Sequence, residues 1–287
     1  MLHLEHLVKT FGAVTAVDDI SLSVPQGQML GIIGRSGAGK TTLLRLINRL
    51  VDPTRGRIVY NSREVSAFKG RELRTWRAHC AMIFQQFHLV HRLDVITNVL
   101  MGRLNYTSTL RSLCKRFSMA DRAMAIRALE RLDMAACALQ PVATLSGGQQ
   151  QRVAIARALV QEAHMVLADE PIASLDLHNA TRVMDALRTI NREDQITVIC
   201  NLHHVDTARA YCDRIIGMHH GRITFDGPPD ALTLTQLREI YGVGSDDEEV
   251  EQALTQGCSG RPWSSRVESH RIKHLAASYE VSKRAEP

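Results

Sequence analysis

Residues Gly34 to Thr41 read Gly-Arg-Ser-Gly-Ala-Gly-Lys-Thr, and they follow the apolar run Leu30-Gly-Ile-Ile. Such a loop between a strand and a helix is typical of a phosphate-binding loop, because its glycines let backbone N–H groups face the phosphates. Lys40 can then reach the β- and γ-phosphates, and the Thr41 hydroxyl can ligate Mg²⁺. The predicted nucleotide-binding residues of this loop are Gly34, Arg35, Ser36, Gly37, Ala38, Gly39, Lys40, Thr41 and Thr42.

A second segment, His164-Met-Val-Leu-Ala-Asp-Glu170, is an apolar run that ends in two acids. Asp169 is placed to hold Mg²⁺, directly or through water, and Glu170 to polarise the attacking water as a general base. A strand that ends in a solvated acidic turn would show the same pattern. The phosphate-binding loop elsewhere in the chain favours the magnesium interpretation.

A third segment, Leu145 to Arg152, reads Leu-Ser-Gly-Gly-Gln-Gln-Gln-Arg. Ser146 has the chemistry of a helix N-cap, and Gly147 and Gly148 leave the backbone accessible beside it. The helix start is a second anion-binding site, which one active site does not need. An ordinary capped helix is the alternative. We therefore predict that the chain binds ATP and hydrolyses it as one half of a dimer.

The order of the expected elements predicts an α/β fold with a mostly parallel sheet, because strands and helices alternate along most of the chain. One helix follows the phosphate-binding loop, with Leu43, Leu44, Leu46, Ile47 and Leu50 on its inner face. Residues 102–140 are expected to be helical. The other helices are expected at residues 149–160 and 180–190, and the strands at residues 2–8, 20–24, 29–33, 57–60, 81–84, 165–168, 196–200 and 214–218.

Composition and charge exclude several other classes of protein. No run approaches 18 apolar residues, so no membrane span is expected, and the first residues do not form a secretory signal. The six cysteines form no Cys-x-x-Cys pair and are expected to be reduced thiols in the cytosol. His219-His220 and the pair His270 and His274 have no evident third ligand, so no second metal is expected.

Two regions differ in composition from the rest. The arginine-rich stretch at residues 111–131 has no interleaved aromatic residues and is interpreted as a solvated helix face, so no nucleic acid is expected. The stretch that begins at Ser245 is acidic and the remainder is polar. We predict a nucleotide-binding domain at residues 1–243, with a helical insertion at about residues 86–148, and a partly disordered tail at residues 244–287. A docking or regulatory segment is the alternative for the tail.

With these three motifs, the chain resembles the ATP-binding subunits of ABC transporters from Met1 to about Asp230. The resemblance implies a P-loop NTPase core, an N-terminal antiparallel β part and an inserted helical subdomain. It also implies that Phe11 stacks on adenine, that Gln85 contacts Mg²⁺ and the attacking water, that Asp176 crosses the dimer interface, and that His203 contacts the γ-phosphate. Ser146, Gly147 and Gly148 would then cap the nucleotide of a second copy of the chain.

The finer resemblance is to phosphonate importers. It rests on the segments Phe84-Gln-Gln-Phe-His-Leu-Val, Thr97-Asn-Val-Leu-Met-Gly-Arg-Leu, Thr107-Ser-Thr-Leu-Arg-Ser-Leu, Asp169-Glu-Pro-Ile-Ala-Ser-Leu-Asp and Asn201-Leu-His. It implies an ATP hydrolase that energises phosphonate uptake, peripheral on the cytoplasmic face of the inner membrane. Transmembrane permease subunits would be partners, with a solute-binding protein as an indirect one. Relatives of this kind usually end near Gly242, so the tail is expected to be a departure from the family.

Other functions stay open at this point. The chain could serve an importer of another small solute, such as phosphite or a polar amino acid. It could be a non-transport ABC ATPase acting on ribosomes or DNA, although those proteins generally have two cassettes or a long coiled coil. It could also be an ATP-dependent clamp in which hydrolysis matters little, but Glu170 and His203 together argue against that.

Overall fold

The structure, a computed structural model, describes residues 1–108, 110 and 115–242. The predicted tail, with His270 and His274, lies outside the described residues. The strands are β1 Leu2–Phe11, β2 Val14–Val24, β3 Met29–Ile33, β4 Arg55–Tyr60, β5 Arg63–Glu64, β6 Cys80–Ile83, β7 Met165–Asp169, β8 Thr197–Asn201, β9 Arg214–His219 and β10 Arg222–Gly227. The α-helices are α1 Lys40–Ile47, α2 Gly70–His79, α3 Val95–Leu100, α5 Met119–Glu130, α6 Gly147–Leu159, α7 Leu177–Glu193, α8 Val205–Tyr211 and α9 Leu234–Tyr241.

The main sheet has the strand order β10-β9-β3-β8-β7-β6. β9, β3, β8, β7 and β6 are parallel, and β10 pairs with β9 in the antiparallel direction. β3, β7 and β8 are buried along their whole length, which is why they read as continuous apolar runs. Because the carboxyl ends of parallel strands meet at one edge, the segments that follow β3, β6, β7 and β8 all start there. The predicted α/β class is confirmed.

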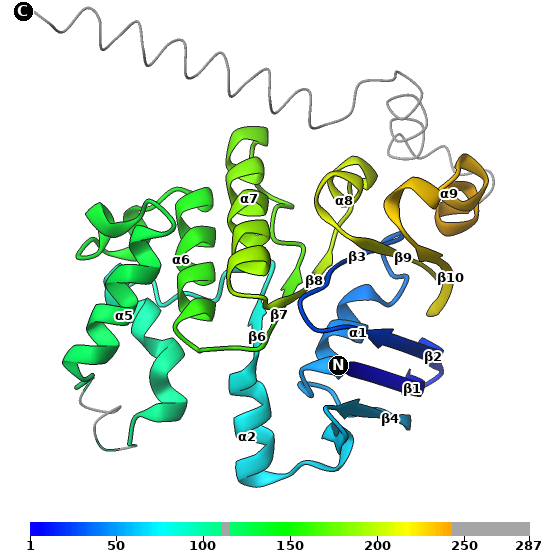
Figure 1. The fold of residues 1–287 in the computed structure, drawn as a ribbon, viewed down its shortest axis with the longest axis horizontal. Coiled ribbons are helices and arrows are strands. Elements are labelled where there is room, and N and C mark those ends of the chain that lie inside the picture. The colour runs from blue at the N-terminus through cyan, green and yellow to red at the C-terminus, as the bar shows by residue number, and fades with distance from the viewer. Residues whose placement is uncertain (109, 111–114, 243–287) are drawn as a thin grey trace, which may run out of the picture.

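The smaller sheet, with the order β2-β1-β4-β5, is antiparallel. Leu43, Leu46 and Ile47 of α1 share one apolar core with this sheet and with Leu30 and Ile32 of β3. Met29 and Ile33, which alternate with those residues along β3, belong to a second core, which contains buried residues of α3, α5, α6, α7, α8 and α9. The alternation along β3 therefore places α1 and the small sheet on one face of the main sheet and α7, α8 and α9 on the other (Figure 1).

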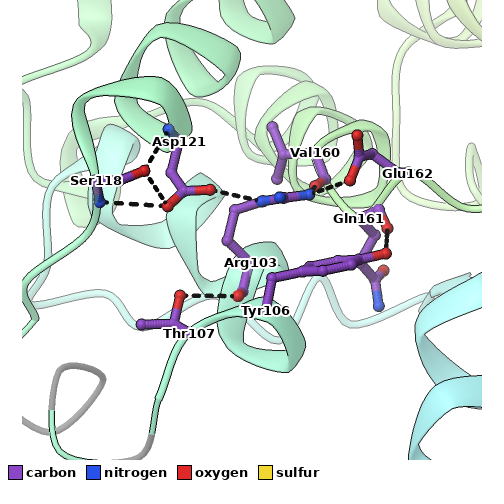
Figure 2. Close-up of polar contacts among 8 residues, drawn as sticks. All are labelled: Arg103, Tyr106, Thr107, Ser118, Asp121, Val160, Gln161 and Glu162. Carbon is purple, nitrogen blue, oxygen red and sulfur yellow. Dashed lines mark hydrogen bonds and ion pairs between the residues drawn. The ribbon is translucent and has the colours of Figure 1, made fainter.

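Between β6 and β7 the described chain is helical, with α3, α5 and α6 and three short 3₁₀ segments, η2 Met101–Tyr106, η3 Ala135–Cys137 and η4 Val142–Thr144. Arg103 of η2 anchors this part (Figure 2). Its guanidinium donates to Asp121 at the start of α5 (2.8 Å), and to Glu162 (2.6 Å) and the Val160 carbonyl (3.0 Å) beyond α6. It also lies 4.0 Å from the ring centroid of Tyr106. A largely buried cation thus joins three segments and meets two carboxylates.

The structure differs from the expected elements at a few places. Leu50 is 44% exposed, because α1 ends at Ile47 and Arg49 takes a left-handed conformation (φ 60°) that turns the chain out of helical spacing. α2, β10, α8 and α9 were not predicted. α2 is mostly polar and buries only Trp76 and Ala78, so it has little apolar periodicity to detect.

The described cysteines are free. Cys80, Cys200 and Cys212 are buried, and burial raises the pKa of the Cys80 and Cys212 thiols to about 12 each. Thiols with such pKa values are protonated at neutral pH and are poor nucleophiles. These three residues act as small apolar core residues.

Replacing Arg103 is expected to weaken the helical part. Arg103→Ala leaves the Asp121 carboxylate, whose side chain is 15% exposed, without its cation. We expect a loss of about 3 kcal/mol in the free energy of unfolding, the lower end for breaking a buried ion pair. Urea titration followed by circular dichroism measures it. Arg122→Ala, at an exposed position of α5, is the control and should stay within about 0.5 kcal/mol of the wild type. Equal stability of the two variants would contradict the anchoring role.

Candidate functional site

The segment between β3 and α1 is a tight loop that ends at the first residue of α1. Gly39, the N-cap of α1, has φ 101°, a conformation that favours glycine. A Cβ atom at Gly39 would lie 2.2 Å from the Ala16 carbonyl oxygen, whereas one at Gly37 would meet nothing within 4 Å. The loop is therefore pressed against the small sheet behind Gly39 and open at Gly37. Arg35, Ser36 and Gly37 are exposed, Gly34, Ala38 and Lys40 are buried, and Gly39, Thr41 and Thr42 are half-buried.

Lys40 stabilises the conformation of this loop through hydrogen bonds to its main chain. Its ammonium group donates to the main-chain carbonyls of Gly34 (2.5 Å) and Arg35 (3.1 Å), and the residue is only 5% exposed. An ammonium group bonded to carbonyls at the rim of the loop lies next to the N–H groups of the α1 start, where an anion is favoured. The structure thus brings together the backbone and the cation that the sequence assigned to phosphate binding.

One oxygen atom of Asp169 joins three elements. Its Oδ1 accepts a hydrogen bond from the Thr41 hydroxyl (2.8 Å) and another from the Asn201 side-chain amide (2.7 Å). Asp169 is 5% exposed at the end of β7, and Asn201 is fully buried at the end of β8. The sequence predicted Thr41 and Asp169 at one site but assigned no role to Asn201. The available signal was an amide at the end of an apolar strand.

These residues fit a magnesium nucleotide. The hydroxyl of Thr41 and the carboxylate of Asp169 are hard oxygen ligands, which Mg²⁺ prefers, and this ion usually takes few protein ligands beside phosphate oxygens and waters. The adjoining loop supplies a backbone cradle in which a Cβ atom at Gly39 would clash. Among the described residues, no group of three or more His, Cys, Asp or Glu side chains could hold a metal by itself. A metal ion at this site would therefore need further oxygen atoms from the phosphates of a bound nucleotide or from water.

Glu170 and His203 contact each other directly. The Nε2 atom of His203 lies 2.6 Å from Oε1 of Glu170, and the two side chains are 27% and 16% exposed. Glu170 follows β7 with φ 51°, a left-handed conformation that turns its side chain away from the strand direction. The hydroxyl of Tyr241 in α9 donates to the His203 carbonyl (3.3 Å). A carboxylate and an imidazole in contact at this edge are suited to moving a proton or orienting water.

Gln85 and Phe11 are exposed residues outside this hydrogen-bonded cluster. Gln85 is exposed, two residues after the end of β6. Phe11 ends β1 in the small sheet, is 50% exposed, and has the Lys9 ammonium 4.9 Å from its ring centroid. Among the described residues, neither side chain forms a hydrogen bond with Thr41 or Asp169. An exposed aromatic ring is available for stacking, and an exposed amide is available to a ligand.

Ser146 caps α6, as predicted. Its hydroxyl accepts from the Gln149 backbone N–H (3.4 Å), and the Gln149 side chain accepts from the Ser146 N–H (2.9 Å), which forms a capping box. Ser146 and Gly147 are exposed. Figure 1 places α6 beside α5 and α7, apart from α1, so this helix start and the phosphate-binding loop are separate places on the chain.

Asp176 begins the neighbouring helix. It caps α7 by accepting from the Asn179 backbone N–H (3.0 Å), and this bond is the main reason that the pKa of Asp176 is lowered. A Cβ atom at Gly148 would lie 2.6 Å from the side chain of Asn179. The starts of α6 and α7 are therefore packed together, and Ser146 and Asp176 form one exposed surface.

None of the helices in the described ranges is long and apolar enough to cross a membrane. A family model described as "ABC transporter" matches residues 17–173. Among curated proteins, the chain is 60% identical over 253 residues to the phosphonates import ATP-binding protein PhnC of Agrobacterium fabrum, covering 88% of each chain. It is 61% identical over 255 residues to the protein of that name from Rhizobium meliloti, covering 89% of this chain and 90% of the relative.

A relative of the same name from Rhizobium johnstonii is 54% identical over 285 residues, or 99% of each chain. The expectation that the tail departs from the family is therefore wrong for this relative. Among solved structures, the chain resembles a dimeric, post-hydrolysis ATP-binding cassette bound to ADP and Pi, with a TM-score of 0.71 and 30% identity, covering 81% of this chain and 100% of that one. A nucleotide-free cassette of an ABC transporter gives a TM-score of 0.72 at 26% identity, covering 89% and 95%.

The loop geometry predicts unequal effects of two alanine substitutions. Gly37 and Gly39 both have positive φ values (80° and 101°), which cost a non-glycine residue about 1–2 kcal/mol. Gly39→Ala also forces a Cβ atom against the Ala16 carbonyl, so we expect a total loss of about 3 kcal/mol or more in the free energy of unfolding. Gly37→Ala, the matched control, should lose about 1 kcal/mol. Urea unfolding without nucleotide measures both, and equal losses would contradict the described packing.

Proposed function

This chain belongs to the ABC transporter family, and from this premise we propose that it is the ATP-hydrolysing subunit of an importer that takes up phosphonates. The contact network of Thr41, Asp169 and Asn201 beneath the phosphate-binding loop is the observation that carries the ATPase proposal. The phosphonate proposal is supported by 54–61% identity to proteins named for phosphonate import.

We propose the following roles for the residues of the site. The backbone of Gly34 to Thr42 and the Lys40 ammonium bind the phosphates of ATP, and Phe11 stacks on the adenine. Thr41, Asp169 and Gln85 hold Mg²⁺, which when bound neutralises charge on the phosphate oxygens. Glu170 accepts a proton from the attacking water as general base. His203, which contacts Glu170 at 2.6 Å, orients that carboxylate and faces the γ-phosphate.

The proposed reaction needs a second copy of the chain. Ser146, Gly147 and Gly148 would cap the nucleotide bound by the partner copy, with Asp176 at the interface. Two features support this arrangement. At the capped start of α6, Ser146 and Gly147 are exposed, and this helix lies apart from α1 and the chain's own phosphate-binding loop. The similar solved cassettes include dimers. ATP would favour the closed dimer and ADP the open one, so hydrolysis becomes a switch.

The importer assignment places the chain at a membrane. We propose that it sits on the cytoplasmic face of the inner membrane as a peripheral subunit and contacts permease subunits through the segment around Gln85. A separate solute-binding protein would be an indirect partner. Because this chain would not touch the solute, an importer of another small solute, such as phosphite, is the second candidate.

Glu170→Gln tests the general base. The substitution keeps the shape of the side chain and removes its basicity, and a general base contributes typically 10²- to 10⁴-fold. We expect steady-state ATPase activity to fall by about that factor while ATP still binds. The variant should accumulate as an ATP-bound dimer in size-exclusion chromatography with Mg·ATP. Wild-type turnover in this variant would refute the assignment of Glu170.

Growth on a phosphonate tests the substrate class. A host strain without this gene should fail on a phosphonate as sole phosphorus source and grow normally on phosphate. Wild-type protein should restore growth, and Lys40→Ala should not, because it removes the cation of the phosphate-binding loop. Normal growth of the deletion strain on phosphonate, in a genome without a second copy, would refute phosphonate uptake and leave the ATPase proposal standing.

A further inference from the structure

Arg157, in the last turn of α6, binds residues 84–88, which we call the Gln85 segment. Its Nη1 donates to the His88 carbonyl (2.7 Å) and its Nη2 to the Phe87 carbonyl (2.9 Å). The fork of the guanidinium therefore binds two consecutive peptide groups, which a lysine with its single nitrogen would not match in the same geometry. The contact joins α6 to a loop about 70 residues earlier in the chain.

The loop is shaped to present both carbonyls on one side. In an extended chain, successive carbonyls point in opposite directions. His88 has φ 48°, a left-handed conformation that breaks this alternation. The ring of His88 packs edge-on against the ring of Phe84, with centroids 4.6 Å apart, so the two ends of residues 84–88 are in contact. Gln85 thus lies in the chain between the end of β6 and the two carbonyls that bind Arg157.

An arginine that binds only carbonyls is an energetically costly side chain for the space between α6 and this loop. Among the described residues no carboxylate forms an ion pair with Arg157, and burial lowers the pKa of its guanidinium. A half-buried cation that meets only neutral carbonyls is poorly compensated, and apolar side chains of similar volume are often as stable or more so. Packing alone therefore does not account for an arginine at this position.

The same end of α6 also holds the segment after α3. A Cβ atom at Gly102 would lie 2.3 Å from the Arg157 carbonyl oxygen, so η2 packs directly on the last turn of α6. Next to it, Arg103 donates to the Val160 carbonyl at 3.0 Å (Figure 2). The two segments that precede α5 are thus attached to one end of a helix whose other end begins at Ser146-Gly147-Gly148.

We propose that α6 acts as a rigid strut and that Arg157 is a positioning residue, which makes the Gln85 segment and the Ser146 end of α6 move together. α6 has 13 residues and spans about 20 Å. A shift of the Gln85 segment reaches the start of α6 through the two hydrogen bonds of Arg157. The inference rests on the proposed function, since it assigns the route by which the two parts of one nucleotide site communicate.

Arg157→Met tests the proposal in the full-length chain. Methionine keeps the apolar stem and removes both hydrogen bonds, so the helix should stay packed. Amide hydrogen exchange at residues 84–92 is expected to become about tenfold faster without nucleotide, while the amides of α1 and β7 keep their rates. The thermal midpoint confirms that the variant is folded. Arg122→Met, at an exposed position of α5, is the matched control and should change neither rate.

The functional readout uses the same substitution in a Glu170→Gln background. ATP affinity, measured at a protein concentration too low for dimers, should be unchanged because the phosphate-binding loop is intact. Dimer formation with Mg·ATP should need about tenfold more protein, since a loosened strut no longer presents the start of α6. Arg157→Lys, which can reach one carbonyl, should fall between methionine and arginine. A merely structural role would lower ATP affinity and the thermal midpoint together.

Two results would overturn the proposal. One is unchanged exchange at residues 84–92 in a folded Arg157→Met chain. The other is accelerated exchange with dimer formation at the wild-type concentration. If the Glu170→Gln chain with Arg157 intact forms no dimer, the proposed dimer mechanism fails, and the nucleotide-free exchange comparison still decides whether Arg157 holds the loop.

Discussion

The architecture of the site depends on the buried carboxylate of Asp169. A carboxyl group that is 5% exposed would be costly to bury without hydrogen bonds, and here one of its oxygens accepts from both Thr41 and Asn201. Those donors stand at the start of α1 and at the end of β8, so the carboxylate fixes three elements at one point. Glu170 follows Asp169 directly, and His203 follows Asn201 by two residues. The contact between Glu170 and His203 is therefore a consequence of the alignment beneath it.

Parallel strand pairing makes this alignment possible. β7 and β8 pair in register, with Asp169 opposite Asn201, so both polar side chains end their strands at the same level. One residue of slip would turn each side chain to the other face of the sheet. The apolar residues that precede them, buried on both faces, hold the register through packing. The positions of Asp169 and Asn201 thus depend on the alternation of side chains between the two faces of the sheet. The same alternation separates the two apolar cores.

The features that the sequence predicted are those that depend only on neighbouring residues in the chain. The phosphate-binding loop, the Asp169-Glu170 pair and the Ser146 cap each lie within one short segment whose flanking pattern indicates a strand or a helix. Asn201, Tyr241 and Arg157 were missed because their roles depend on partners far away in the chain. Arg157 binds main-chain carbonyls, which have no signature in the sequence. α2 escaped prediction because its surface is polar, and Leu50 was misplaced because the left-handed Arg49 ended the helix early.

Arg103 of η2 and Arg157 of α6 both form hydrogen bonds near the end of α6. Together they stabilise the helical part and allow it to transmit movement. Arg103 meets Asp121 and Glu162, and hydrogen bonds between charged groups are stronger than those to neutral acceptors. Arg157 meets only the carbonyls of Phe87 and His88. The link between η2, α5 and α6 is therefore stronger than the link between α6 and the Gln85 segment. α6 and the helices around it therefore form one body, and the two hydrogen bonds of Arg157 tie the Gln85 segment to that body.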